Sequence, residues 1–187
     1  MFDSLIEIDK NILIFLNNLG SERFDALWLI ITKQSSWLLF FSFLAYLIIK
    51  KTSWKNFLLV IIFIAVLLTV GNESVEASKL YFERLRPCND PSINTLIRVV
   101  KESKSFGFVS GHAANSISTM VFIYLLIKKY YRYSFLIFLY PLIFAYSRIY
   151  LGVHFLGDIL AGYTFGIMLG FGFFIGYEKV KTKYHFN

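Results

Sequence analysis

Apolar stretches of helical length alternate with short polar turns along most of this chain. A helix needs about 20 apolar residues to cross a bilayer. We expect crossings at 37–49 (with a start inside 24–36), 57–83, 110–127, 133–150 and 154–177. The pattern predicts an all-α membrane protein, a polytopic bundle of about five transmembrane helices. The number rises to six if the N-terminal region holds one more span.

The N-terminal segment, residues 1–35, has a different pattern. Residues 4–18 place their apolar side chains on one helical stripe, formed by Leu5, Ile8, Ile12, Phe15 and Leu16. Acidic residues and asparagines lie elsewhere around the helix, so this segment is too polar to cross a bilayer comfortably. We predict an amphipathic helix at the membrane interface. A short amphipathic piece over 24–32 and a polar break at Lys33-Gln34 follow it.

The second predicted span continues beyond its apolar part. Its helical pattern passes through Asn72, Glu73 and Glu76 to about Glu83, so its end should project into water or curl over a site. Residues 85–109 then form the one long polar loop of the sequence. A loop of this length in a small protein is usually functional, and we expect it to belong to an active site.

Composition agrees with a membrane protein. Of the 187 residues 57% are hydrophobic and 19% aromatic, and the mean hydropathy of +0.60 exceeds that of ordinary soluble domains. The length suits one compact domain over 1–187. The net charge of +7 does not indicate nucleic-acid binding, because the basic residues stand at the ends of apolar segments. The single cysteine, Cys88, cannot form an intrachain disulfide.

The distribution of basic residues predicts the topology. With five spans, the basic clusters at 50–55, 128–132 and 179–183 fall on one side, which the positive-inside rule makes cytoplasmic. The loop 85–109 and the turn 147–158 then share the opposite face. We expect a multi-pass protein of the bacterial cytoplasmic (inner) membrane, with its site on the outer, periplasmic or extracellular, face.

Glycines recur every fourth residue in the last predicted span, at Gly162, Gly166 and Gly170, with Gly176 further on. Such spacing lets helices approach closely in lipid. We expect tight packing within the bundle, and a homodimer seam is the alternative.

Three ionisable residues lie where a bilayer would exclude them unless they faced a cavity: Arg148, His154 and Asp158. If the helix is continuous there, His154 and Asp158 lie one turn apart on one face. The carboxylate can then hold one ring nitrogen and leave the other for a substrate, and Arg148 offers a fork suited to phosphate oxygens. The alternative is an interfacial salt bridge between Arg148 and Asp158, with His154 near the membrane surface.

Two further clusters point the same way. Lys79 and Arg86 are seven residues apart, two turns on one helical face, and Pro87 disfavours helix at Arg86. Two cations there suit a dianionic phosphate, although such residues also occur as ordinary interfacial cations.

The other cluster is Ser110-Gly111-His112. Ser110 is a plausible N-cap for the third predicted span, and Gly111 lets the backbone approach closely. Amides at a helix N-terminus bind anions, and His112 can donate a proton there.

In this order and topology, K-x6-R-P, S-G-H and S-R-x5-H-x3-D resemble the type 2 phosphatidic acid phosphatase superfamily. The motifs stand here as Lys79…Arg86-Pro87, Ser110-Gly111-His112 and Ser147-Arg148…His154…Asp158. The middle motif usually begins with proline, and Val109 replaces it. That departure affects the stiffness of the loop and not a reacting group.

The resemblance implies a role for each motif residue. His154 would attack phosphorus and form a phosphohistidine, Asp158 would fix its tautomer, and His112 would protonate the leaving oxygen and then activate water. The remaining residues would bind the phosphoryl oxygens: Lys79, Arg86, Arg148, Ser110 and the amides of Gly111 and His112. Cations and amides would supply the electrophilic assistance, so we expect neither a metal nor another cofactor. We leave open the roles of Glu73 and Glu76, which precede Lys79.

The resemblance implies a lipid phosphatase that hydrolyses a phosphate or pyrophosphate monoester of a membrane lipid. Candidate substrates are undecaprenyl pyrophosphate, lipid A phosphates, phosphatidylglycerophosphate and phosphatidic acid, and an outward-facing site favours the first two. One alternative is a phosphotransferase that passes the phosphoryl group from His154 to a second lipid. Another is a non-enzymatic membrane protein that binds anionic headgroups in the same basic pocket.

Overall fold

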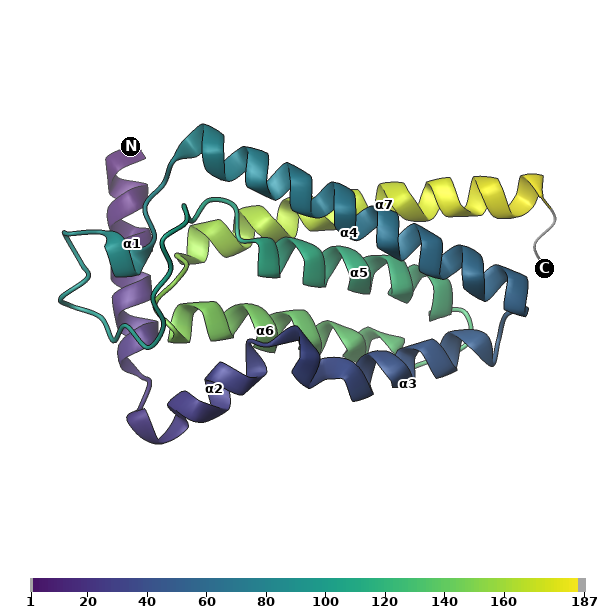
Figure 1. Cartoon of the computed structure of the whole chain (residues 1–187), viewed down its shortest axis with the longest axis horizontal. Coiled ribbons are helices and arrows are strands. Elements are labelled where there is room, and N and C mark those ends of the chain that lie inside the picture. The colour runs from purple at the N-terminus through teal and green to yellow at the C-terminus, as the bar shows by residue number, and fades with distance from the viewer. Residues whose placement is uncertain (1, 185–187) are drawn as a thin grey trace.

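The computed structural model describes residues 2–184, and all of its regular elements in this range are helical, as predicted (Figure 1). The α-helices are α1 Phe2–Asn18, α2 Asp25–Ile31, α3 Leu38–Ile49, α4 Trp54–Phe82, α5 Gly111–Ile127, α6 Leu139–Tyr150 and α7 Leu156–Lys183. Short 3-10 helices lie at Glu22–Phe24, Gln34–Trp37, Pro87–Asn89 and Ser134–Phe138.

Two helices, α4 and α7, are long and apolar enough to cross a membrane on their own. Glu22–Ile31 and Gln34–Ile49 form a pair bent by 73° at the predicted polar break, and together they pass the same test. Gly111–Ile127 and Ser134–Tyr150 are shorter apolar helices. At about 1.5 Å per residue, each of these spans somewhat less than the bilayer core. Five crossings therefore remain a prediction.

Helix α5 occupies the centre of the bundle and packs against α4, α6 and α7 (Figure 1). Its contact with α7 depends on the regularly spaced glycines. A methyl group on Gly162 would lie 2.8 Å from the carbonyl oxygen of Ser110, and methyls on Gly166 and Gly170 would collide with other α5 carbonyls. The predicted tight packing within the bundle is therefore confirmed for these three glycines.

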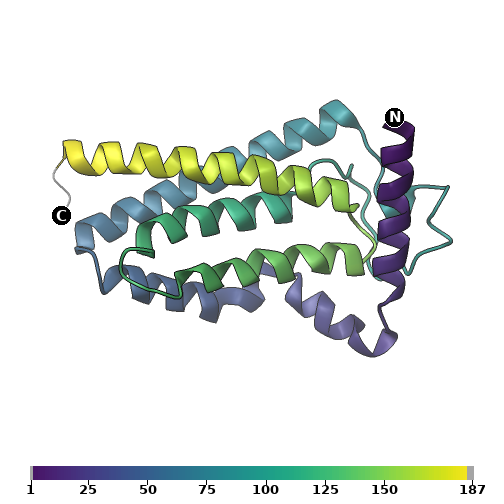
Figure 2. The same ribbon diagram turned by 180° about the vertical axis from the view of Figure 1, so that it is seen from behind.

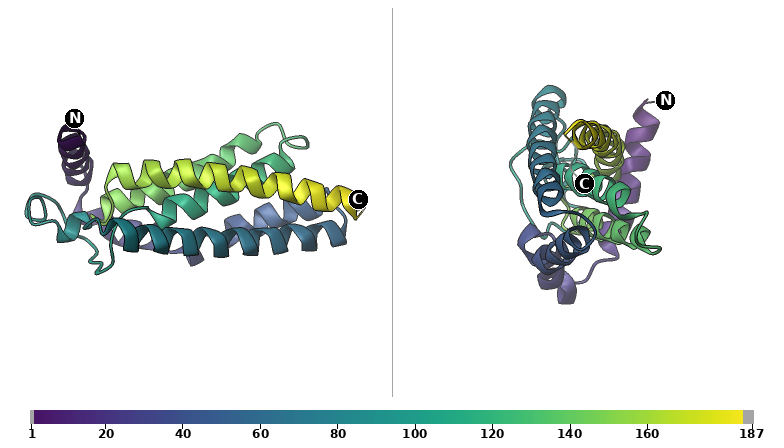
Figure 3. Two further views of the ribbon diagram at one scale, coloured as in Figure 1. Left: turned by 90° about the horizontal axis from the view of Figure 1, so that it is seen from above. Right: turned by 90° about the vertical axis from the view of Figure 1, so that its right-hand side faces the viewer.

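Helix α1 lies across one end of the bundle (Figures 1 and 2) and is seen nearly along its own axis in the left view of Figure 3. Its inner face carries polar groups: the buried Asn17 donates to the carbonyl oxygens of Ile149 and Tyr150 at the end of α6. Most of the predicted apolar stripe faces outward, and Ile8 and Phe15 are more than half exposed. This orientation leaves an apolar surface of the kind that suits a membrane interface.

The two ends of the bundle differ in chemistry. The α3–α4 turn, the α5–α6 turn and the C-terminal end of α7, which carry the three basic clusters, lie at the end away from α1 (Figure 1). The loop 83–110 and the α6–α7 turn lie at the α1 end. The sequence predicted this separation, and the assignment of each end to a membrane face stays a prediction.

Two local predictions need correction. Helix α4 ends at Phe82, and Glu83 takes a left-handed conformation with φ of 45°, so Lys79 and Arg86 do not share a helical face. Helix α7 begins at Leu156, and His154 therefore precedes it instead of starting it. The predicted span over 133–150 is helical from Ser134 to Tyr150, and its first part is a 3-10 helix, because Pro141 has no N–H with which to extend an α-helix backward.

Candidate active site

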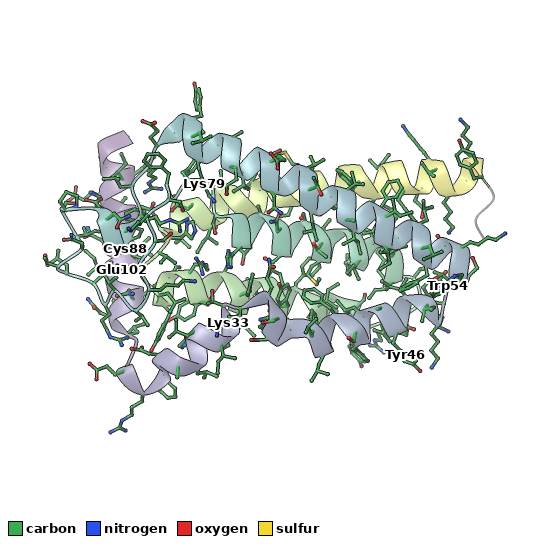
Figure 4. All side chains as sticks on the ribbon, in the orientation of Figure 1. Lys33, Tyr46, Trp54, Lys79, Cys88 and Glu102 are labelled. Atoms are coloured by element: carbon green, nitrogen blue, oxygen red, sulfur yellow. The ribbon has the colours of Figure 1, made fainter. Side chains whose placement is uncertain are left out.

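The predicted site residues converge at the α1 end of the bundle, where α4 and α6 finish and α5 and α7 begin. In Figure 4 the labelled Lys79, Cys88 and Glu102 lie at this end, whereas Tyr46 and Trp54 lie toward the other. The turn between α6 and α7 holds His154, and the loop 83–110 lies over it. The backbone joins these parts, since the amide of Cys88 donates to the carbonyl oxygen of Gly152 at 3.1 Å.

His154 is held from both sides of its ring. Nδ1 lies 3.3 Å from Oδ2 of Asp158, and Nε2 lies 2.9 Å from Nη1 of Arg86. A guanidinium can only donate, so Nε2 must offer its lone pair and Nδ1 must carry the proton. The carboxylate of Asp158 is thereby the acceptor for Nδ1–H. This tautomer makes Nε2 the ring atom that carries the lone pair, as nucleophilic chemistry requires, and Arg86 must release that lone pair before it can attack.

Asp158 reaches His154 from the first turn of α7. Its Oδ2 also accepts from the amide of Phe155 at 3.0 Å, which fixes the carboxylate at the helix N-terminus, where negative charge is favoured. Its side chain is fully buried. The predicted alternative of a salt bridge between Arg148 and Asp158 is wrong, because Oδ1 of Asp158 pairs with Arg84 at 2.7 Å.

Arg86 is buried, with 4% of its surface exposed. Its donors meet neutral acceptors: the carbonyl oxygens of Ser105 and Val153 and the Ser105 hydroxyl, at 2.8, 3.0 and 3.0 Å. No carboxylate forms an ion pair with it within residues 2–184. Burial lowers the pKa of Arg86, but a guanidinium stays protonated in proteins. The site thus holds a positive charge that forms no direct ion pair in the described chain, although Asp158 is close enough to act on it electrostatically.

Arg148 repeats this arrangement on α6. It is 5% exposed, its Nη1 donates to the Thr32 hydroxyl at 2.6 Å, and its Nε is buried with no hydrogen-bond partner. Among the described residues it too has no ion-pairing carboxylate. A buried, unpaired cation is costly. Two such cations beside one histidine form a site that an anion would stabilise.

The second histidine belongs to α5. Ser110 is the N-cap of this helix, as predicted, and its hydroxyl accepts from the amide of Ala113. The Ser110 amide donates to the carbonyl oxygen of Asp158 at 3.1 Å, which joins the starts of α5 and α7. The ring of His112 stacks on Phe144 with centroids 4.9 Å apart. His112 is close enough to Arg148 and His154 to interact electrostatically with both.

Lys79 approaches the same centre from the last turn of α4 and interacts electrostatically with His154. Its ammonium group also pairs with Glu76 at 2.6 Å, a partnership that the sequence left open. Glu73 is exposed on the same helix.

Several groups at the site have no counterpart in the motifs. Arg84 bridges Asp158 to Asp9, and Thr32 and Ser105 hold the two buried arginines. Lys101 adds positive charge nearby: burial, followed by the fields of Arg148 and Arg86, lowers its pKa. Among these supporting residues, Arg84 could have been found from the sequence, because it lies two positions before the motif residue Arg86. The others come from segments whose position the sequence alone does not give.

Comparisons with known proteins concern the sequence and the fold as a whole. Residues 54–181 match the PAP2 superfamily. The chain is 32% identical over 187 residues to the lipid A 4′-phosphatase of Bacteroides thetaiotaomicron, covering 98% of this chain and 83% of that protein. It is 26% identical over 183 residues to the lipid A 4′-phosphatase of Porphyromonas gingivalis, covering 96% and 77%.

The fold is similar to that of a transmembrane PAP2 type phosphatidylglycerolphosphate phosphatase from Bacillus subtilis, known from a crystal structure. The TM-score is 0.72, with 21% identity, over 95% of this chain and 88% of that one. At this identity the similarity concerns the fold alone.

Proposed function

This chain belongs to the PAP2 superfamily and is a membrane lipid phosphatase, and on that premise we propose that it hydrolyses a phosphate monoester of lipid A through a phosphohistidine on His154. The observation that carries the chemistry is the pair of buried guanidinium groups, Arg86 and Arg148, that form no direct ion pair with a carboxylate in the described chain. A dianionic phosphate would supply the missing negative charge.

In the first step, Nε2 of His154 attacks phosphorus and the bond between phosphorus and the lipid oxygen breaks. His112 gives its proton to that oxygen, so the lipid leaves as an alcohol. Asp158 accepts the hydrogen bond from Nδ1–H and stabilises the positive charge that develops on the ring. Arg86, Arg148 and Lys79 stabilise the charge on the phosphoryl oxygens, and the amides at the start of α5 add further donors.

In the second step, His112, now neutral, takes a proton from water. The water oxygen attacks phosphorus, the bond between phosphorus and Nε2 breaks, and inorganic phosphate leaves. Both steps use the same cations, and His112 is restored to its starting protonation state. The sum is lipid phosphate plus water giving lipid alcohol plus phosphate.

The substrate proposal follows from the relatives. Both proteins named above are lipid A 4′-phosphatases, and the alignments extend over almost the whole of this chain. Among the four lipids that the motifs allow, lipid A phosphate is therefore our first choice, with undecaprenyl pyrophosphate, phosphatidylglycerophosphate and phosphatidic acid as competitors. An inner-membrane location with the site on the outer face would give access to such a lipid.

Phosphate release by the purified protein in detergent tests both parts. We expect the highest kcat/KM with bisphosphorylated lipid A, a product that has lost the 4′-phosphate by mass spectrometry, and at least about a 10³-fold loss in His154→Ala. Faster hydrolysis of one of the other three lipids would overturn the assignment of lipid A as the preferred substrate. Undiminished release by His154→Ala would overturn the mechanism.

A further inference from the structure

A line of ionic contacts runs from Asp158 to the N-terminal helix. Nη1 of Arg84 donates to Oδ1 of Asp158 at 2.7 Å, and Nη2 donates to Oδ2 of Asp9 at 2.8 Å. We propose that Asp9, acting through Arg84, is a positioning residue that holds Asp158 in the orientation that directs His154. The inference deepens the proposed function and rests on it.

The contacts of Asp158 explain why it needs such support. Its Oδ2 serves the amide of Phe155 and Nδ1 of His154, whereas Oδ1 is occupied by Arg84. Arg84 and the Phe155 amide together fix the rotation of the carboxylate about its last bond, one at each oxygen. If the Arg84 contact is lost, the carboxylate can turn, and the 3.3 Å contact with Nδ1 is the one that loosens. The correct tautomer of His154 depends on that contact.

Arg84 is suited to positioning and not to binding phosphate. Both of its terminal nitrogens are engaged by carboxylates, and its Cζ lies 4.3 Å from the centroid of the Phe155 ring. A planar guanidinium held on two edges and one face is rigid. It also neutralises a carboxylate that is fully buried. In this it differs from Arg86 and Arg148, which form no direct ion pair with a carboxylate in residues 2–184.

Asp9 is built into this contact from the other side. Besides Arg84, it accepts from the amide of Gly157, in the first turn of α7, at 2.9 Å. A methyl group on Gly157 would lie 2.7 Å from Oδ2 of Asp9, so only glycine lets the carboxylate come this close. Asp9 lies outside residues 54–181, which match the family. The N-terminal helix of this chain would thus help to order a catalytic centre contained in the family region.

The first test compares two variants that each break one ion pair of α1. Asp9→Asn removes the negative charge opposite Arg84. Lys10→Gln removes the neighbouring 2.9 Å ion pair with Asp90, which includes neither Arg84 nor Asp158. We expect Asp9→Asn to lower kcat about tenfold, the lower end for a group that supports a catalytic contact. KM and inhibition by inorganic phosphate should not change, and Lys10→Gln should match the wild type. Equal losses in both variants would show that Asp9 only docks α1.

Arg84 supplies the second test. We expect Arg84→Gln to lower kcat by about 10- to 100-fold, Arg84→Lys to restore part of it, and Asp9→Asn to add nothing in the Arg84→Gln background. A raised KM with unchanged kcat in Arg84→Gln would make Arg84 a phosphate ligand and overturn the inference. So would independent, additive losses from the two substitutions.

A spectroscopic readout separates this inference from the proposed function. With ¹⁵N-labelled histidine, we expect an Nδ1–H signal of His154 in the wild type and in Lys10→Gln, and its broadening in Asp9→Asn and Arg84→Gln. If the wild type released no phosphate but the signal responded in this way, the proposed phosphatase function would be wrong and the positioning role of Asp9 and Arg84 would be supported. A signal unchanged in both variants would overturn the positioning.

Discussion

Nη1 of Arg86 lies 2.9 Å from Nε2 of His154, the ring nitrogen that must reach phosphorus in the proposed mechanism. Because guanidinium only donates, this contact sets the tautomer of the ring and also marks where a phosphoryl oxygen would come to lie. The same side chain is anchored to Ser105 by two hydrogen bonds. Arg86 is therefore anchored beside the nucleophile, and in the proposed mechanism Nη1 passes from Nε2 to a phosphoryl oxygen before Nε2 attacks phosphorus.

A lysine at position 86 would keep the charge and lose the fork. We predict that Arg86→Lys lowers kcat/KM roughly 100-fold, the loss expected for one donor to a charged transition state. Phosphate release from the preferred lipid measures it. Arg98→Lys is the matched control, because Arg98 lies in the same loop and pairs with Asp25 outside the site. Equal activities for Arg86→Lys and the wild type would remove Arg86 from the phosphate site.

Thr32 holds Arg148 by one short hydrogen bond. Hydrogen bonds to charged groups contribute about 1.5–3 kcal/mol, so we predict that Thr32→Val raises KM about tenfold or more as Arg148 becomes mobile. Thr69→Val is the control, since the Thr69 hydroxyl donates to the carbonyl oxygen of Ala65 within its own helix. Steady-state kinetics in detergent would decide. An unchanged KM in Thr32→Val would mean that Arg148 needs no such anchor.

His154 should stay neutral in mildly acidic solution. Burial, together with the positive fields of Arg86 and Arg148, holds the pKa of His154 well below its usual value near 6.5. As the pH falls below about 6.5, the unfolded chain takes up a proton here that the folded protein refuses. This group therefore reduces the free energy of unfolding by up to about 1.4 kcal/mol per pH unit.

We predict that the ring ¹⁵N signals of His154 do not shift between pH 7.5 and about pH 5.5. Loss of these signals in His154→Ala provides the assignment. A titration of His154 with a midpoint near 6.5 would contradict the electrostatic account of the site.

The packing of α5 on α7 makes a prediction about stability. A methyl group in Gly166→Ala would collide with the carbonyl oxygen of Ala114 and the side chain of Ile117. We expect it to destabilise the protein by about 1–3 kcal/mol. Gly172→Ala, whose methyl would meet nothing within 4 Å, should be neutral or more stable by about 0.5–1 kcal/mol. Thermal unfolding in detergent compares the Gly166→Ala and Gly172→Ala variants. Equal melting temperatures would contradict the close packing of α5 on α7.

The helices could be predicted from the sequence because long apolar runs and turn residues determine them locally. Helix α5 matches the predicted span within a residue, and its N-cap is the predicted Ser110. The predicted shared helical face of Lys79 and Arg86 was wrong because α4 ends at Phe82. Sequence spacing predicts which residues share a helical face only as long as the helix is continuous between them.

The supporting contacts of the site could not be predicted. Asp9 meets Arg84 across 75 positions of sequence, and Thr32 meets Arg148 across 116. Both contacts exist because α1 crosses the end of the bundle and the chain bends between α2 and α3. Such tertiary placement leaves no periodic trace in the sequence. The motifs therefore named the groups of the proposed chemistry and missed the groups that hold them.

The central claim is that His154 carries the phosphoryl group between lipid and water. The His112→Ala variant can be mixed rapidly with an aryl phosphate, whose leaving group needs no proton. We expect the phosphohistidine to form and then to accumulate, because its hydrolysis lacks the base His112. Peptide mass spectrometry after an alkaline quench would locate the modification. We predict phosphate on His154, and none after the same treatment of the His154→Ala variant. Phosphate on another residue, or turnover in wild-type protein that never modifies His154, would contradict the account.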